Sequence, residues 1–223
     1  MFIKGKKMSK SSTNGVSPME VIEIYGSDVA RLHVHFLGGY EDNTPWTYDG
    51  INGIVSFINK VWGLSDMIKG EEVSKEHIVD LNKTIKKVGE DLENLRLNTA
   101  ISALMIFLKK VRDDGFITKE ELRQFLILLN PLAPHITSEM YEKIFNAEII
   151  DASWPKYDEK YLVENTIEIP IQVNGKLRGK IKVNRDEKEE IVKELALKEV
   201  KNYTENGYKK LIYIPSRLVN IVV

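Results

Sequence analysis

The chain has 223 residues, of which 43% are hydrophobic, and a formal net charge of −1, which is typical of a globular protein of one or two domains. It contains no cysteine, and this excludes disulfides, thiolate nucleophiles and thiolate metal ligands. No apolar run approaches the roughly 20 residues that span a bilayer, and no apolar core of a secretory signal follows the first residues, so we expect a cytoplasmic protein without a membrane partner.

The first segment with a chemical signal is the polar stretch KKMSKSSTNG, residues 6–15. It has no apolar pattern that would anchor it as a helix or strand. It places two ammonium and two hydroxyl groups within five residues, at Lys7, Ser9, Lys10 and Ser11. Such donors suit phosphate oxygens, because they can follow charge as it moves during displacement at phosphorus. Composition alone favours a disordered basic tail over a phosphate-binding loop.

Two short helices are predicted next. Ser17-Pro18-Met19-Glu20 has the sequence of a capping box with proline at the first helical position. This helix is expected to end near Gly26. Ser27 or Asp28 is then expected to cap a second helix, which stops at Gly38-Gly39.

Amphipathic helices are predicted from residue 47 onward, because apolar residues recur there at spacings of three and four. The stripes cover residues 47–69, 78–95, 101–111, 118–130 and 136–145. Ser74 is an expected cap, Thr118-Lys119-Glu120-Glu121 is a second capping box, and Pro131 ends the helix that follows it. The short loops between these helices indicate an antiparallel bundle.

The sequence changes character around Trp154-Pro155. Residues 167–173 alternate apolar and polar side chains and lead into Asn174-Gly175, a strong hairpin signal. A helix capped by Asp186 and two further strands complete a small β-β-α-β-β unit. Pro170 indicates that the first strand lies at an edge of the sheet.

The returning strand of the hairpin carries cations that are predicted to share one face: Lys176, Arg178, Lys180 and Lys182. A solvated strand face and a nucleic-acid contact are the two interpretations, and the residues alone favour neither. Three nearby tyrosines are expected in the core of so small a domain, although they are also able to stack on an exposed base: Tyr203, Tyr208 and Tyr213.

The histidines and one asparagine receive structural interpretations. His33 and His35 are two residues apart and so lie on different sides of a helix, with no acid or cysteine at metal-binding spacing, and no metal site is predicted. His135 follows Pro134 and is predicted to serve packing, with capping or orienting the last bundle helix as the alternative. Asn98 is expected to cap the helix that follows it.

Several segments carry a family resemblance. Lys7-Met8-Ser9-Lys10-Ser11 is identical to the KMSKS motif of class I aminoacyl-tRNA synthetases, whose mobile loop closes over ATP. Tyr25–Leu32 resembles the segment that follows this loop in the family, and four further segments resemble its helical domain in matching order: Val61-Trp62, Leu97–Ile101, Asn130–Ile136 and Ser153–Pro155. Within the class, Val173–Ile181 and the final strands, residues 212–223, are similar to the bacterial leucyl enzymes. The resemblance covers nearly the whole chain but only the C-terminal part of such an enzyme, because no HIGH motif, nucleotide-binding sheet or editing insertion is present.

The resemblance implies a reaction for the whole enzyme. Leucine's carboxylate attacks the α-phosphate of ATP, pyrophosphate leaves, and the adenylate acylates a ribose hydroxyl of the tRNA's terminal adenosine. Lys10 is expected to offset charge as the bond to pyrophosphate breaks, with Lys7, Ser9 and Ser11 shaping the loop and Met8 anchoring its apolar side. ATP is thus a substrate and Mg²⁺ is expected in the full enzyme, but this part alone is expected to hold neither and to be inactive.

The resemblance also implies partners and a fold. The predicted fold is mainly α: residues 1–45 contain the ATP loop and following helices, residues 46–160 an anticodon-binding-type bundle, and residues 161–223 an α/β tRNA-binding domain. Contacts with leucine tRNA are expected from Lys176, Arg178, Lys180, Lys182 and Arg217. The other partners are the catalytic and editing domains, in cis or in trans. The alternatives are a stand-alone tRNA-binding module, the small subunit of a split class I synthetase, or a related enzyme for isoleucine, valine or methionine.

Overall fold

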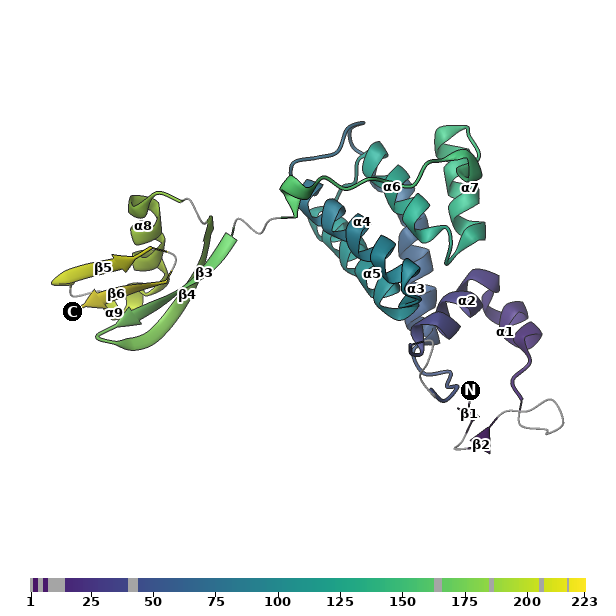
Figure 1. Cartoon of the computed structure of the whole chain (residues 1–223), viewed down its shortest axis with the longest axis horizontal. Helices are drawn as coiled ribbons and strands as arrows, with labels where there is room; N and C mark the ends of the chain where they lie inside the picture. Colours follow the sequence, from purple (N-terminus) through teal and green to yellow (C-terminus); the bar gives the residue numbers. More distant parts are fainter. Residues whose placement is uncertain are drawn as a thin grey trace. The chain divides into compact units, whose positions relative to one another are not determined.

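The computed structural model describes residues 2–3, 6–7, 15–39, 44–162, 166–184, 187–204, 207–215 and 217–223. The chain forms two compact units, Met1–Leu162 and Val163–Val223, and each has its own hydrophobic core. Helices make up the first unit apart from one short strand pair, and a four-stranded sheet makes up much of the second (Figure 1). The predicted fold class, a helical bundle followed by a small α/β domain, is confirmed.

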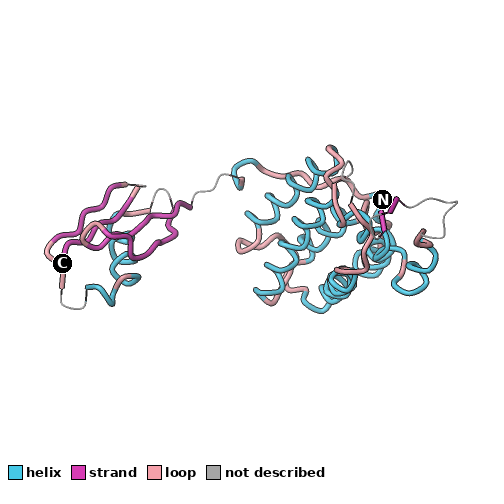
Figure 2. Tube along the Cα trace, turned by 90° about the horizontal axis from the view of Figure 1, so that it is seen from below, coloured by secondary structure: helices cyan, strands magenta, loops and turns pink. Residues whose placement is uncertain are grey.

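The first unit contains the predicted series of amphipathic helices. They are α1 (Pro18–Tyr25), α2 (Ser27–Phe36), α3 (Ile51–Trp62), α4 (Ile78–Glu93), α5 (Leu97–Asp114), α6 (Lys119–Leu129) and α7 (Pro134–Phe145). Three 3₁₀ turns, Gly63–Met67, Ile149–Asp151 and Glu159–Tyr161, and the paired strands β1 (Phe2–Ile3) and β2 (Lys6–Lys7) complete its described elements. Figure 2 shows the helices of this unit as cyan coils of the Cα trace that lie beside one another. Their apolar stripes meet in one core, in which Leu104 and Phe125 are fully buried.

The capping box at the start of α6 is confirmed. The Thr118 hydroxyl accepts a hydrogen bond from the Glu121 amide at 3.3 Å, and the Glu121 carboxylate accepts one from the Thr118 amide at 2.9 Å. Two amide donors that the helix itself leaves unpaired are thereby satisfied.

The capping predictions for the other short helices are wrong in part. Ser17 is the N-cap residue of α1, but its side chain makes no capping hydrogen bond. Gly26, with φ of 87°, is the N-cap of α2, so neither Ser27 nor Asp28 caps that helix. Arg96 rather than Asn98 precedes α5. A residue with a capping side chain does not cap a helix when its side chain has a better partner elsewhere, as Asp28 does.

The second unit has the predicted β-β-α-β-β order. Its elements are β3 (Thr166–Val173), β4 (Lys176–Asn184), α8 (Glu189–Glu199), the short α9 (Lys201–Thr204), β5 (Lys210–Ile214) and β6 (Leu218–Val222). Asn174 and Gly175 form the hairpin turn with φ of 49° and 77°, the left-handed conformations that this dipeptide tolerates. The predicted helix cap, Asp186, lies outside the described residues.

The predicted edge position of β3 is wrong. The strand order is β4-β3-β6-β5, so β3 lies between two partners. Its described pairs with β6 begin at Ile171, one residue after Pro170. The missing amide hydrogen of Pro170 therefore removes no described β3–β6 pair, and the proline is tolerated in an inner strand.

No helix in the described part of the chain is long and apolar enough to cross a membrane.

Candidate nucleic-acid interface

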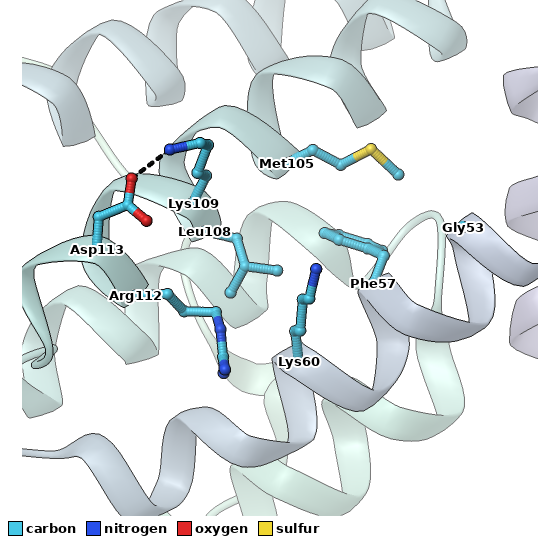
Figure 3. Close-up of a pocket in the computed structure, with 8 residues that line it drawn as sticks. All are labelled: Gly53, Phe57, Lys60, Met105, Leu108, Lys109, Arg112 and Asp113. Carbon is cyan, nitrogen blue, oxygen red and sulfur yellow. Dashed lines mark hydrogen bonds and ion pairs between the residues drawn. The ribbon is translucent and has the colours of Figure 1, made fainter.

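A groove with a volume of about 370 Å³ lies between α3 and α5 in the helical unit. Its apolar floor is formed by Phe57, Met105 and Leu108, and Phe57 and Leu108 are almost completely buried. Charged side chains from both helices stand around this floor (Figure 3). Lys60 follows Phe57 by three residues in α3, and residues three apart are neighbours on a helix. The ammonium group of Lys60 therefore lies at the margin of the helix face that buries Phe57.

Two cations of this groove are available to a ligand. Lys109 is paired with Asp113, four residues further along α5. Among the described residues, Lys60 and Arg112 form no ion pair with a carboxylate, and the Arg112 guanidinium lies 3.9 Å from the sulfur of Met67. Two exposed cations from neighbouring helices above an apolar floor suit adjacent phosphates of a nucleic-acid backbone.

The cations predicted on β4 do not form one stripe, because the strand contains a β-bulge. Gly179 pairs with Ile171 but Leu177 pairs with Gln172, so Arg178 has no partner in the register. Directly opposed residues point to the same side of a sheet. Leu177, which is 57% exposed, therefore lies on the outer side, whereas Lys176, opposite Val173, lies on the side of the buried residues.

The β4 cations consequently have different surroundings. Lys180 and Lys182 flank the Glu168 carboxylate, each at 3.7 Å. The Arg178 guanidinium stacks over the Tyr203 ring, 4.7 Å from its centroid. The prediction of one face shared by all four cations is therefore wrong, because only Lys180 and Lys182 share a face in the register. A single inserted residue reverses the alternation on which the prediction depended.

The tyrosine prediction is wrong for two of the three residues. Tyr203 and Tyr208 are 46% and 48% exposed, and only Tyr213 packs against the core of the second unit. Arg217 lies in the turn between β5 and β6 and is exposed. The second unit therefore offers exposed aromatic and cationic side chains, the two kinds that contact unpaired RNA.

The predicted ATP loop lies mostly outside the described residues. Lys7 is in β2, where its backbone pairs with Phe2. Met8, Ser9, Lys10 and Ser11 belong to the part of the chain that the structure does not describe.

The histidines have structural partners. His33 is buried and its Nε2 lies 2.7 Å from the carbonyl oxygen of Thr47. His35 is half-buried, and burial, followed by the nearby Arg31 guanidinium, lowers its pKa. His135 is exposed, so its predicted packing role is wrong, and its Nδ1 lies 2.8 Å from the Asp28 carboxylate.

His77, which is completely buried, was not predicted from the sequence. Its two ring nitrogens lie 2.8 Å from the Glu121 carboxylate and 3.0 Å from the Asp114 carboxylate. The groove cations Lys60 and Arg112 were not predicted from the sequence either. The available signal was their position at the edge of an apolar stripe, but every exposed helix shows cations there, and only the packing of α3 beside α5 brings these two together.

Comparison with known proteins places this geometry among tRNA ligases. The family described as "Anticodon-binding domain of tRNA ligase" matches residues 75–193. The family described as "tRNA synthetases class I (I, L, M and V)" matches residues 2–45.

Individual relatives cover nearly the whole chain. A leucine–tRNA ligase of Alkaliphilus oremlandii is 37% identical over 228 residues, which are 98% of this chain and 28% of the relative. One of Borrelia hermsii is 40% identical over 222 residues, 97% of this chain and 26% of the relative. The crystal structure of the ternary complex of an Agrobacterium radiobacter K84 LeuRS with tRNA and LeuAMS superimposes with a TM-score of 0.69 at 26% identity, covering 100% of this chain and 32% of that one. The chain thus spans between a quarter and a third of the length of these proteins.

Proposed function

Because the chain belongs to the anticodon-binding domain family of tRNA ligases and matches the C-terminal part of leucine–tRNA ligases, we propose that it contributes tRNA-binding surfaces and an ATP-closing loop to the ATP-dependent attachment of leucine to tRNA. The observation that carries this proposal is the 37–40% identity to leucine–tRNA ligases over 97–98% of the chain. The rest of that enzyme, including its catalytic and editing domains, would be supplied in cis or in trans.

The ATP loop in this proposal consists of Lys7, Met8, Ser9, Lys10 and Ser11. Their identity with the KMSKS motif supports the assignment. Lys10 offsets the negative charge that develops as pyrophosphate leaves, and Lys7 acts with it. Neutralising a cation that acts mainly in the transition state reduces the rate more than it weakens ground-state binding.

The tRNA-facing surfaces in this proposal are the α3–α5 groove and the exposed cations of the second unit. Lys60 and Arg112 hold phosphates at the groove. Lys180, Lys182 and Arg217 add further phosphate contacts in the second unit. Arg178 and Tyr203 present a stacked pair that an unpaired base is able to extend, with Lys176 beside the hairpin turn.

Mg²⁺ is expected to accompany ATP in the full enzyme. In the described ranges, no group of three His, Asp or Glu side chains is placed to hold a metal ion. We therefore assign no residue of this chain to Mg²⁺, and each step attributed to the chain depends on its own lysines.

The reaction is tested with Lys10→Ala in the full enzyme. Leucine-dependent exchange of pyrophosphate into ATP should lose about 10²-fold or more in kcat, the scale found when one preorganised donor to a developing oxyanion is removed, while leucine binding changes little. Lys4→Ala, a lysine outside the motif, is the matched control. Equal losses in rate and in leucine affinity would contradict the assignment, and exchange by this chain alone would show that it needs no catalytic partner.

The groove is tested by measuring the affinity of the chain for leucine tRNA across a range of salt concentrations. The double variant Lys60→Ala/Arg112→Ala should bind more weakly and should reduce the salt slope by about 2, because each lost phosphate contact reduces it by about 1. Lys75→Ala removes an exposed lysine outside the groove and should leave the slope close to wild type. An unchanged slope in the double variant would remove the groove from the interface.

A further inference from the structure

Asp28 connects two parts of the helical unit that are distant in sequence. It lies in the first turn of α2 and is only 7% exposed. Its carboxylate accepts hydrogen bonds from the backbone amides of His135 at 3.3 Å and Ile136 at 2.7 Å. These amides open α7, more than 100 residues away in the sequence.

α7 depends on this carboxylate for its capping. The N-cap residue of α7 is Ala133, which has no side-chain acceptor. Free amides at a helix start require acceptors, and a negative charge there is favoured by the helix dipole. Asp28, on another helix, supplies both the acceptor oxygens and the negative charge.

Two neighbouring contacts reinforce the junction. His135 Nδ1 lies 2.8 Å from the Asp28 carboxylate and 3.2 Å from the Ser27 hydroxyl. A nitrogen that faces a carboxylate oxygen carries the hydrogen, so Nδ1 donates to Asp28. One turn further along α2, the Arg31 guanidinium donates to the carbonyl oxygen of Pro131 at 3.1 Å. The first two turns of α2 are thus hydrogen-bonded to both ends of the segment Pro131–Ile136.

The position of this junction in the chain gives it a consequence for the proposed reaction. Only α1 and a short connection separate α2 from the ATP loop, residues 7–11, whereas α7 packs in the helical bundle that carries the groove. From this we infer that the Asp28–His135 junction, here called the α2–α7 clamp, is a positioning device that fixes the ATP-loop segment on the tRNA-binding bundle. Its role is to couple tRNA held by the bundle to the reacting phosphate, and Asp28 touches neither ligand. The inference rests on the proposed function.

Two reactions of the full enzyme separate this role from simple stabilisation. Pyrophosphate exchange without tRNA reports on the ATP loop alone, and tRNA charging reports on the loop and the bundle together. In Asp28→Ala, kcat/KM for tRNA in charging should fall about tenfold or more, the equivalent of about 1.4 kcal/mol, and the exchange rate should stay within about twofold of wild type.

Graded variants sharpen the test. Asp28→Asn keeps one acceptor oxygen for the Ile136 amide and should recover part of the charging activity. His135→Ala removes the exposed half of the clamp and should have a smaller effect than Asp28→Ala. Glu23→Gln, which removes one negative charge from the exposed face of the adjacent α1, is the matched control and should behave as wild type.

Every other outcome overturns the inference. A parallel loss of exchange and charging would show a merely stabilising residue, and an unchanged charging rate would show that the clamp does not couple the two sites. Absence of exchange in the wild-type enzyme would instead contradict the proposed function.

Discussion

Glu121 is a buried carboxylate that makes the helical unit sensitive to acid. Burial alone would raise its pKa, but hydrogen bonds from the Thr118 amide, the His77 ring and Ser74 outweigh burial and lower the pKa below its ordinary value of 4.5. A group whose pKa is lower in the folded state stabilises the fold above its unfolded pKa, and that contribution is lost as the pH falls through the folded pKa.

Glu121→Gln should therefore reduce the free energy of unfolding at pH 7. The amide NH₂ would face a donor whichever way it is turned, because Ser74 donates to one oxygen, and Thr118 and His77 donate to the other. The expected loss is about 1 to 3 kcal/mol, the cost of leaving a buried donor unpaired. The difference from wild type should shrink as the pH falls below 4.5, the ordinary pKa of an unfolded glutamate, and on through the lower pKa that Glu121 has in the folded state. Urea unfolding followed by circular dichroism at neutral and acid pH measures the loss of unfolding free energy and its change with pH. A loss that is independent of pH would contradict this account.

At the scale of elements, two helix starts with similar sequences differ in structure and offer a matched comparison. Both α1 and α6 follow a serine or threonine with glutamate three residues later, but only Thr118 makes the capping hydrogen bond. Thr118→Ala should cost about 1 kcal/mol, and Ser17→Ala should cost only a few tenths. Thermal or urea unfolding measures the loss of stability in each variant. Equal losses would show that the cap geometry of the structure does not govern stability.

Elements were predictable where local chemistry decides them. The stripes of α4 and α5, the Thr118 box and the Asn174-Gly175 hairpin depend on neighbours within a few residues, and all are present. The predictions that failed depend on distant partners. Asp28 caps a helix more than 100 residues away, Pro170 is tolerated because β6 begins its pairing after it, and Arg178 leaves the register at a bulge.

The residues of the candidate site also separate into those that a local pattern identifies and those that depend on distant partners. The motif at residues 7–11 is local and was identified from the sequence. The α3–α5 groove requires Lys60 and Arg112 to be brought together from two helices, which no local pattern specifies. His77 was missed because a histidine between two distant acids, Asp114 and Glu121, looks in sequence like any polar residue near a helix start.

At the scale of the whole molecule, the two units have cores without a common residue among those described. Ile101 in the first core and Ile171 in the second are both fully buried. Ile101→Val and Ile171→Val should each cost about 0.5 to 1.5 kcal/mol, and each should lower amide protection only in its own unit. Hydrogen exchange resolved by peptide tests this, and loss of protection in both units from either change would mean that they unfold as one.

The order of strands in the small sheet has a consequence for synthesis in the cell. β6 pairs with β3 in parallel and separates it from β5, although β6 is the last of the four to be translated. While the nascent chain grows, the β3–β4 hairpin leaves the ribosome with the edge beside Ile171 uncovered, and such an edge invites pairing with other chains. A translational pause or a premature stop before residue 218 would leave that edge open. Chaperones and quality-control proteases should therefore bind this protein mainly in the state in which the sheet still lacks β6.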